Sequence, residues 1–366
     1  MAVFKIFAEK DTTLYSEYET LNSGMDPILE LSKAVSLKYS GQSSTARILI
    51  KFSDADINDV LGKYVGQKDF QAFLKLNLAD STGLSPEYTL EAYPVYGSWD
   101  MGTGHYLDIK TPTNGAAWVS RGADGTNAWP TSSFPAGVTA SFTAQNPGGG
   151  AWYIDYPATE SYSVYTKKDT NIDVTRAIKA FVSGTITNDG FIIKTSGSLE
   201  FSTAYSYTLN YFSRDTNTVY PPVLEIKWDS STYNISGSTA SLISNQDVVL
   251  SLSNNKEVFN ENEIYRFRTS VRDLYPVRTF STSSIYNQQK LLPSSSYYAI
   301  KDLKSNEFVV DFDPIYTKIS ADTLSNYFDV HMYGLEPERY YKILIKTEIS
   351  GSVTVFDDRY IFKVIQ

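Results

Sequence analysis

Short apolar runs separated by turn residues constrain the fold of this chain more than any other feature. Beyond residue 246 the chain reads "DVVLSLS", "EIYRFRTSVRDL", "SYYAIKDL", "EFVVDFD", "YFDVHMYG", "RYYKILIKTEI" and "YIFKVIQ". These runs recur about once every ten to fifteen residues, which is the spacing of strands in a small all-β domain. Residues 247–366 are therefore predicted to form an immunoglobulin-like β-sandwich.

The first part of the chain has the same strand character, with two short helices added. The strands are expected in the runs "AVFKIF", "ARILIKF", "FQAFLKLNL", "YTLEAYPVYG", "DGFIIKTS", "YTLNYF" and "PPVLEIKW". One helix is indicated by apolar residues at i, i+3, i+4 and i+7 (Ile57, Val60, Leu61 and Tyr64), with Ser53 or Asp54 as its N-cap. A second helix has Ile178, Phe181 and Val182 on its inner face and Gly184 as its C-cap.

Two adjacent prolines mark where the first domain closes. Pro221 and Pro222 directly precede "VLEIKW", and because proline cannot donate to a β-ladder it belongs at the start of a strand. After Trp228 the chain becomes polar and rich in Ser, Thr and Asn. We therefore expect a domain over 1–229, a polar linker over 230–246 and a second domain over 247–366.

A Gly- and Trp-rich insertion, about residues 97–151, interrupts the first domain. Long irregular loops inside a domain are uncommon and often functional. This one and its boundary carry the candidate ligand or interface residues Trp99, Trp118, Trp129, Trp152 and His105. Exposed aromatic rings stack on sugars or anchor protein interfaces. The alternative is that the four tryptophans form a small core over a sheet edge and that His105 is a solvated loop residue.

The sequence contains few residues in patterns that are typical of a catalytic site. His105 and His331 are the two histidines, and His331 alternates with apolar residues as a structural strand position does. The loop carboxylates Asp124, Asp155, Glu160 and Asp169 have no spacing that brings them together as a glycosidase pair. "DADIND" lacks the glycine and final glutamate of a calcium loop, and "NPGGGAW" lacks the Lys-Ser/Thr of a phosphate loop. The sequence predicts no enzyme, no catalytic residue, no metal site and no cofactor.

Net charge and composition limit the classes of partner that the chain is expected to bind. The net charge is −9, and acidic residues outnumber basic ones on both sides of Asp229, so nucleic acid and anionic membranes are poor partners. Cysteine is absent, and no run of about 18 apolar residues could span a membrane. The start of the chain meets Lys5 and Glu9 early, unlike a signal peptide, so synthesis in the cytoplasm is expected.

Taken in order, the motifs of residues 3–228 resemble the DNRLRE domain family. The matching pieces are "AEKDTTLYSEY", "NSGMDPILEL", "ARILIKF", "FQAFLKLNL", "IDVTRAIKAFVSG", "DGFIIK" and "YFSRDTNTVYPPVLEIKW". The chain departs from the family pattern at Asp215, where the family more often has Glu, and in its longer glycine-rich insertion. The resemblance implies a jelly-roll-like β-sandwich in an adhesive or carbohydrate-associated role.

Together these features favour a non-enzymatic structural protein of a tailed-phage virion. The C-terminal region looks like structural proteins of marine contractile-tailed phages, which assemble in the host cytoplasm and leave by lysis. The expected partners are other neck, tail or capsid proteins, further copies of the chain as a homo-oligomer, and a host-surface glycan. An extracellular carbohydrate-binding or adhesion module of a cell-surface protein is the alternative, and a polysaccharide-degrading enzyme is a third reading.

Overall fold

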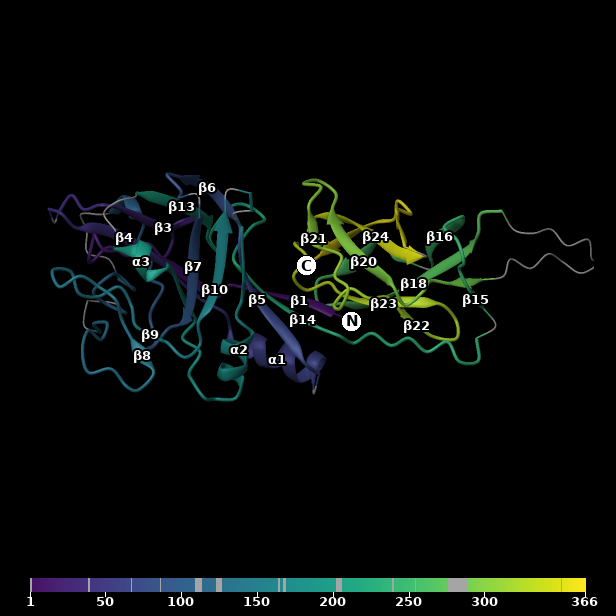
Figure 1. The fold of residues 1–366 in the computed structure, drawn as a ribbon, viewed down its shortest axis with the longest axis horizontal. Coiled ribbons are helices and arrows are strands. Elements are labelled where there is room, and N and C mark those ends of the chain that lie inside the picture. Colours follow the sequence, from purple (N-terminus) through teal and green to yellow (C-terminus); the bar gives the residue numbers. More distant parts are fainter. Residues whose placement is uncertain are drawn as a thin grey trace, which may run out of the picture. The chain divides into compact units, whose positions relative to one another are not determined.

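The computed structural model of the 366-residue chain describes residues 2–38, 40–66, 68–85, 87–108, 114–122, 127–163, 165–166, 169–201, 206–238, 240–253, 255–275, 289–349 and 351–366, with the side chains of 2, 198 and 199 left out. Nearly all regular structure is β, which confirms the predicted class (Figure 1). The chain forms two compact units. The N-terminal unit comprises residues 6–64 and 71–225, and the C-terminal unit comprises residues 1–5, 65–70 and 226–366.

The C-terminal unit contains two sheets. The first has the order β15 (Ser241–Leu242), β19 (Lys290–Leu291), β18 (Ile264–Asp273), β23 (Asn326–His331) and β22 (Ser320–Ala321), and β16 (Val248–Ser253) also pairs with β18. The second has the order β17 (Val258–Asn260), β26 (Ile361–Ile365), β24 (Tyr340–Ile349), β20 (Ser296–Asp302) and β21 (Phe308–Val310), and β25 (Ser352–Phe356) also pairs with β24.

This strand order is immunoglobulin-like. The run β16-β18-β23-β22 corresponds to strands A, B, E and D, and β26-β24-β20 corresponds to G, F and C. One shared core joins side chains of the first sheet, such as Phe267 and Phe328, to side chains of the second, such as Phe362. Near the start of β24 the Tyr341 hydroxyl donates to the Glu336 carbonyl at 2.9 Å, which is the tyrosine corner of this fold.

The domain boundaries differ in two places from those expected. The segment 230–246 was expected to be a linker, but it is hydrogen-bonded within the C-terminal unit. Thr232 and Asn234 exchange backbone bonds with Ala321, and the Tyr233 hydroxyl donates to the Leu292 carbonyl. At the other end of the chain, Val3 belongs to the core of the C-terminal unit, together with residues more than 200 positions away.

The larger sheet of the N-terminal unit has the order β10 (Ala158–Ser163), β7 (Glu87–Pro94), β12 (Phe191–Thr195), β4 (Ser43–Lys51), β3 (Ile28–Val35), β13 (Tyr207–Phe212) and β6 (Leu78–Thr82), and β2 (Lys10–Tyr15) also pairs with β4. A four-stranded sheet has the order β1 (Ala2–Phe7), β14 (Val223–Trp228), β5 (Phe70–Leu76) and β11 (Thr170–Asp173). β8 (Val138–Thr139) pairs with β9 (Trp152–Tyr153).

Proline placement and the first helix follow the sequence. β14 begins at Val223, directly after Pro222, and ends at Trp228. The helix α1 (Asp54–Val60) has Ser53 as its N-cap, whose side chain accepts a bond from the Asp56 amide, and it continues into the π-helical turn η1 (Leu61–Val65).

The second helix is confirmed with one correction. α2 (Thr175–Val182) ends in a Schellman motif, in which Gly184 at φ 71° donates to the Phe181 carbonyl and Thr185 donates to the Ala180 carbonyl. Val182, expected on the inner face, is exposed, and the buried side chains of α2 are those of Ala177, Ile178 and Ala180. Two short elements, η2 (Tyr106–Asp108) and α3 (Gly197–Glu200), were not foreseen.

Candidate functional site

The four tryptophans predicted as ligand or interface residues are core residues. Trp99, Trp118, Trp129 and Trp152 are each 1–3% exposed, and they pack in one cluster of the N-terminal unit with Leu14, Leu49, Val95, Ala116 and Ile192. The expectation of exposed, stacking rings is thereby corrected. The structure has the alternative arrangement, in which the irregular segment 97–151 folds over the sheet and contributes a core of its own.

Backbone carbonyls satisfy the indole N–H groups of this cluster. Trp99 donates to Asp189, Trp118 to Asn146 and Trp129 to Ala117, at 2.8, 3.3 and 2.9 Å. Buried indoles need such partners, because a desolvated N–H without an acceptor is costly. The tryptophans therefore fix a segment that has little regular secondary structure.

Arg47 on β4 is fully buried next to these rings. Its Nε donates to Glu200 Oε1 at 2.6 Å, its Nη1 to the Gly149 carbonyl at 2.5 Å and its Nη2 to the Ser141 carbonyl at 2.6 Å. The guanidinium group thus joins β4, α3 and the irregular segment. Because every one of these bonds is charge-assisted, the junction is strongly directional.

Two indole rings and a glycine complete the surroundings of Arg47. Its guanidinium carbon lies 4.9 Å from the Trp118 ring centroid and 5.3 Å from that of Trp152. A Cβ on Gly149, which has φ 77°, would come within 2.5 Å of the Trp118 ring and 2.8 Å of Arg47 Nη1. The glycine run that resembles a phosphate loop is therefore explained by close packing around Arg47.

A second buried cation closes the charge cluster. Lys194 Nζ on β12 bonds to Glu91 Oε2 at 2.6 Å and lies 3.8 Å from Glu200 Oε2. The cluster of Arg47, Lys194, Glu91 and Glu200 holds two positive and two negative groups, so its formal charges cancel. Its geometry indicates a structural role, since each charge is already matched inside the protein.

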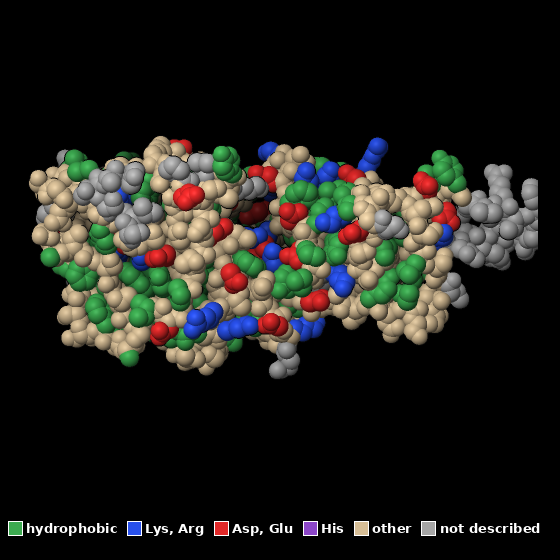
Figure 2. Space-filling model, viewed as in Figure 1, with side chains coloured by type: hydrophobic (Ala, Val, Ile, Leu, Met, Phe, Trp, Pro, Cys, Tyr) green, Lys and Arg blue, Asp and Glu red, His purple; other side chains and the backbone are tan. Residues whose placement is uncertain are grey.

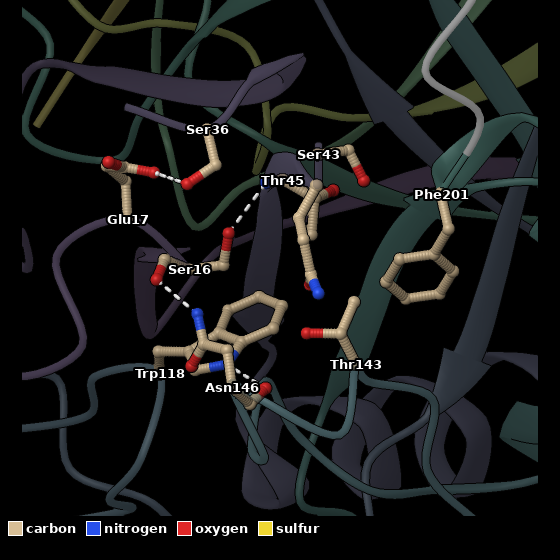
Figure 3. Close-up of a pocket in the computed structure, with 10 residues that line it drawn as sticks. Ser16, Glu17, Ser36, Ser43, Thr45, Trp118, Thr143, Asn146 and Phe201 are labelled. Atoms are coloured by element: carbon tan, nitrogen blue, oxygen red, sulfur yellow. Dashed lines mark hydrogen bonds between the residues drawn. The ribbon is translucent and has the colours of Figure 1, made fainter. Parts of the chain in front are cut away.

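A small polar pocket lies beside this cluster. Ser43, Thr45 and Arg47 alternate on one face of β4, so the pocket and the charge cluster share a wall. The residues that line the pocket come from the ends of β2 and β3, from β4, from the irregular segment and from the turn after α3; they are Ser16, Glu17, Ser36, Gln42, Ser43, Thr45, Trp118, Thr143, Asn146 and Phe201 (Figure 3).

Internal hydrogen bonds hold the pocket walls in place. Asn146 Nδ2 donates to the Ser16 carbonyl, and Ser16 Oγ accepts from the Thr45 amide at 2.7 Å (Figure 3). In contrast, three buried side-chain atoms of the pocket lining have no hydrogen-bond partner among the residues that the structure describes: Gln42 Oε1, Ser43 Oγ and Asn146 Oδ1. Such a gathering is unusual, because buried polar atoms are almost always paired.

His105, the remaining predicted candidate, lies apart from the tryptophan cluster. Its side chain is half exposed, and its Nδ1 lies 3.5 Å from Asp26 Oδ1. Burial raises the pKa of Asp26, while its bond from the Tyr106 amide and the nearby imidazole act in the opposite direction. The arrangement fits a solvated loop histidine that directly precedes η2, with its amide donating to the Asp108 carboxylate.

No family model matches the chain, and no curated protein matches it either. Within the described residues, no group of three or more metal-binding side chains lies close enough together to hold an ion. The described part of the chain also contains no helix with the length and apolar character needed to cross a membrane. Asp124 lies outside the described residues.

The charge cluster and the polar pocket are the features that sequence reasoning missed. Arg47 lies within the expected "ARILIKF" strand, and a charged residue inside an apolar strand is the one sequence signal that marks it as a buried partner. No sequence pattern shows that Gln42, Ser43 and Asn146 line one pocket, because only the tertiary structure brings them together.

Proposed function

We propose that this protein is a non-enzymatic structural component of a tailed-phage virion, mounted through its C-terminal unit. The observation that carries the proposal is the apolar character of the outer face of the sheet that contains β24. Exposed faces of sandwich sheets normally carry polar side chains. On this face five apolar side chains are 40–59% exposed: Val258, Tyr340, Val353, Val355 and Ile361.

The register shows that these side chains belong to one surface. Residues opposite each other in an antiparallel pair share a face. Tyr340 opposes Lys363, Lys342 opposes Ile361, and Lys346 opposes Val355. Between these positions, Tyr341, Ile343 and Ile345 point into the core. We call the surface made by Val258, Tyr340, Val353, Val355 and Ile361 with the three lysines the outer patch.

The outer patch has the composition of a protein-binding surface. Apolar groups and the stems of lysines alternate on it, and Lys363 Nζ lies 5.9 Å from the Tyr340 ring centroid. Hydrophobic, basic and acidic side chains are interspersed on the visible face of the C-terminal unit (Figure 2). Exposed apolar patches rimmed by polar residues mark interaction sites on soluble proteins. β25 adds a strand that pairs only with β24 within the described residues.

The virion assignment also draws on the resemblance of residues 3–228 to the DNRLRE family and of the C-terminal region to phage structural proteins. The gene neighbourhood tests it directly. Portal, sheath or tail-tube genes beside this gene are the expected result. A polysaccharide-utilisation cluster in that place would favour the cell-surface adhesion module instead.

Incorporation into particles tests the outer patch. Val353→Asp with Val355→Asp places two charges on the patch without touching the core, so the double variant should fold but fail to join particles that lack the protein. Leu324→Asp is the matched control, because Leu324 is also exposed in the C-terminal unit but lies outside the patch. Normal incorporation of the double variant would contradict the proposed docking surface.

A further inference from the structure

Two lysines lie directly opposite each other on the sheet that carries the outer patch. Lys301 on β20 pairs in register with Lys342 on β24. Both side chains are on the outer face, because Tyr341, the next position along β24, points into the core. Like charges at directly opposite positions destabilise a sheet. Sequences keep local conflicts of this kind mainly at functional sites.

Aromatic rings lie next to two of the lysines on this face. Lys301 Nζ is 4.9 Å from the Phe308 ring centroid. Lys346 Nζ is 5.0 Å from the ring centroid of Phe312 and 5.4 Å from that of Tyr297. Neither ammonium group has an ion-pair partner among the residues that the structure describes. The rings hold the lysine stems in place and leave both positive charges available to a partner.

The outer face of the other sheet in the same unit differs in this respect. There Arg266 donates to both carboxylate oxygens of Asp329, at 2.7 and 2.9 Å. Arg268 Nη2 donates to Asp322 Oδ2 at 2.7 Å. These cations are therefore neutralised by carboxylates of the chain itself.

Carboxylates reach the outer-patch face from its borders. Asp357, just after β25, lies 3.0 Å from Lys342 Nζ, and Glu338, just before β24, pairs with Lys363. Along β20 and β24, which the structure describes completely, Glu348 is the one acidic residue at an outward position, and it lies near the end of its strand. The face therefore carries an excess of positive charge, although the whole chain has a net charge of −9.

We infer that the partner of the outer patch is an acidic protein surface on the particle, whose carboxylates pair with Lys301 and Lys346. Apolar groups of the same surface cover Val353 and Val355, which a small anion would leave exposed. The inference rests on the proposed function, because it names the kind of surface on which the patch docks. Carboxylates enclosed between the two proteins bind these ammonium groups more strongly than exposed carboxylates do.

The salt dependence of binding to particles that lack the protein tests the inference. Full-length protein is added to these particles in about 50 mM and about 500 mM NaCl, which differ strongly in screening, and bound protein is measured after sedimentation. The apparent Kd should rise about tenfold at the higher salt, because ion pairs across the interface are screened.

A double variant removes the two charges and keeps the apolar stems. Lys301→Met with Lys346→Met should bind about tenfold more weakly than the wild type at the lower salt, and its binding should depend little on salt. Its Tm should not fall, because the repulsion between Lys301 and Lys342 is removed. Lys63→Met with Arg272→Met is the matched control, since it removes two positive charges outside this sheet, and it should bind as the wild type does.

The outcomes separate this inference from the proposed function. If the wild type does not bind the particles, both fail. If the wild type binds, the variant with Val353→Asp and Val355→Asp does not, and the lysine double variant binds as the wild type does at both salt concentrations, only the inference fails. Wild-type binding to phosphatidylglycerol vesicles that the lysine double variant loses would assign these lysines to an anionic membrane and would also overturn the inference.

Discussion

Removing the carboxylate of Glu200 should destabilise the N-terminal unit far more than removing a comparable carboxylate at the surface. In Glu200→Gln the amide oxygen can still accept from Arg47 Nε. The second oxygen, 3.8 Å from Lys194 Nζ, is replaced by a donor that faces a cation. The buried cluster then carries a net positive charge. Breaking one side of a buried ion pair costs about 3–5 kcal/mol, a large fraction of the roughly 5–15 kcal/mol that stabilises a typical domain.

Urea unfolding followed by tryptophan fluorescence measures this effect. Four of the five tryptophans lie in the N-terminal unit, so the signal reports mainly on that unit. With a slope of about 2 kcal/mol per molar urea, a loss of about 3 kcal/mol moves the midpoint down by about 1.5 M. Asp59→Asn is the control, because Asp59 pairs with Lys63 at 2.6 Å on the exposed surface. The urea midpoint of Asp59→Asn should equal that of the wild type.

A double variant separates charge from packing. Arg47→Met combined with Glu200→Gln removes both charges, and its loss should be smaller than the sum of the two single losses because no buried cation is left without its partner. The double variant still loses the donors to the Gly149 and Ser141 carbonyls, as Arg47→Met alone does. Two results would contradict this prediction: equal small shifts for Glu200→Gln and Asp59→Asn, or a double variant whose loss is the sum of the single losses.

Three further predictions follow from single contacts. Burial raises the pKa of Asp11 to about 7, above its ordinary value, so the folded state holds this proton more tightly than the unfolded state does. The free energy of unfolding should therefore fall by about 4 kcal/mol as pH rises from about 4 to 7, and Asp11→Asn should abolish that decline in urea titrations at several pH values. Tyr341→Phe removes the bond to the Glu336 carbonyl and should cost the C-terminal unit about 1 kcal/mol, read as a lower Tm, whereas Tyr340→Phe on the exposed face should not. Limited proteolysis should spare 230–246 while the C-terminal unit is folded, because that segment is bonded to β22 and its neighbours; early cleavage there would restore the linker first expected.

Local sequence patterns made the secondary structure predictable. Contacts between residues far apart in the sequence could not be predicted from such patterns. The strand that follows Pro222, the Ser53 cap and the Gly184 cap each depend on residues a few positions apart, so their chemistry can be read directly. The burial of Trp118 depends on Arg47, and Arg47 depends on Glu200, a residue 153 positions further along the chain. Val3 shows the same limit, because its membership of the C-terminal core has no local signal.

The candidate site was partly predictable for the same reason. The sequence marked the irregular segment 97–151 as unusual, and that segment does supply Trp118, Thr143 and Asn146 to the pocket. It left two roles open for the tryptophans, because aromatic side chains in a loop look alike whether they face solvent or fold inward; their burial matches the small-core alternative. The unpartnered oxygens became visible only when four distant parts of the chain were brought together.

Hydrogen–deuterium exchange of the protein, free and mounted on the particle, tests the proposed function most directly. The amides of Ser352–Phe356 and Ile361–Ile365 should gain protection on the particle, because β25 and β26 carry the outer patch. β7 and β10 of the N-terminal unit should exchange at the same rate in both states. Protection gained only in the N-terminal unit, with β25 unchanged, would contradict the claim that the outer patch is the mount.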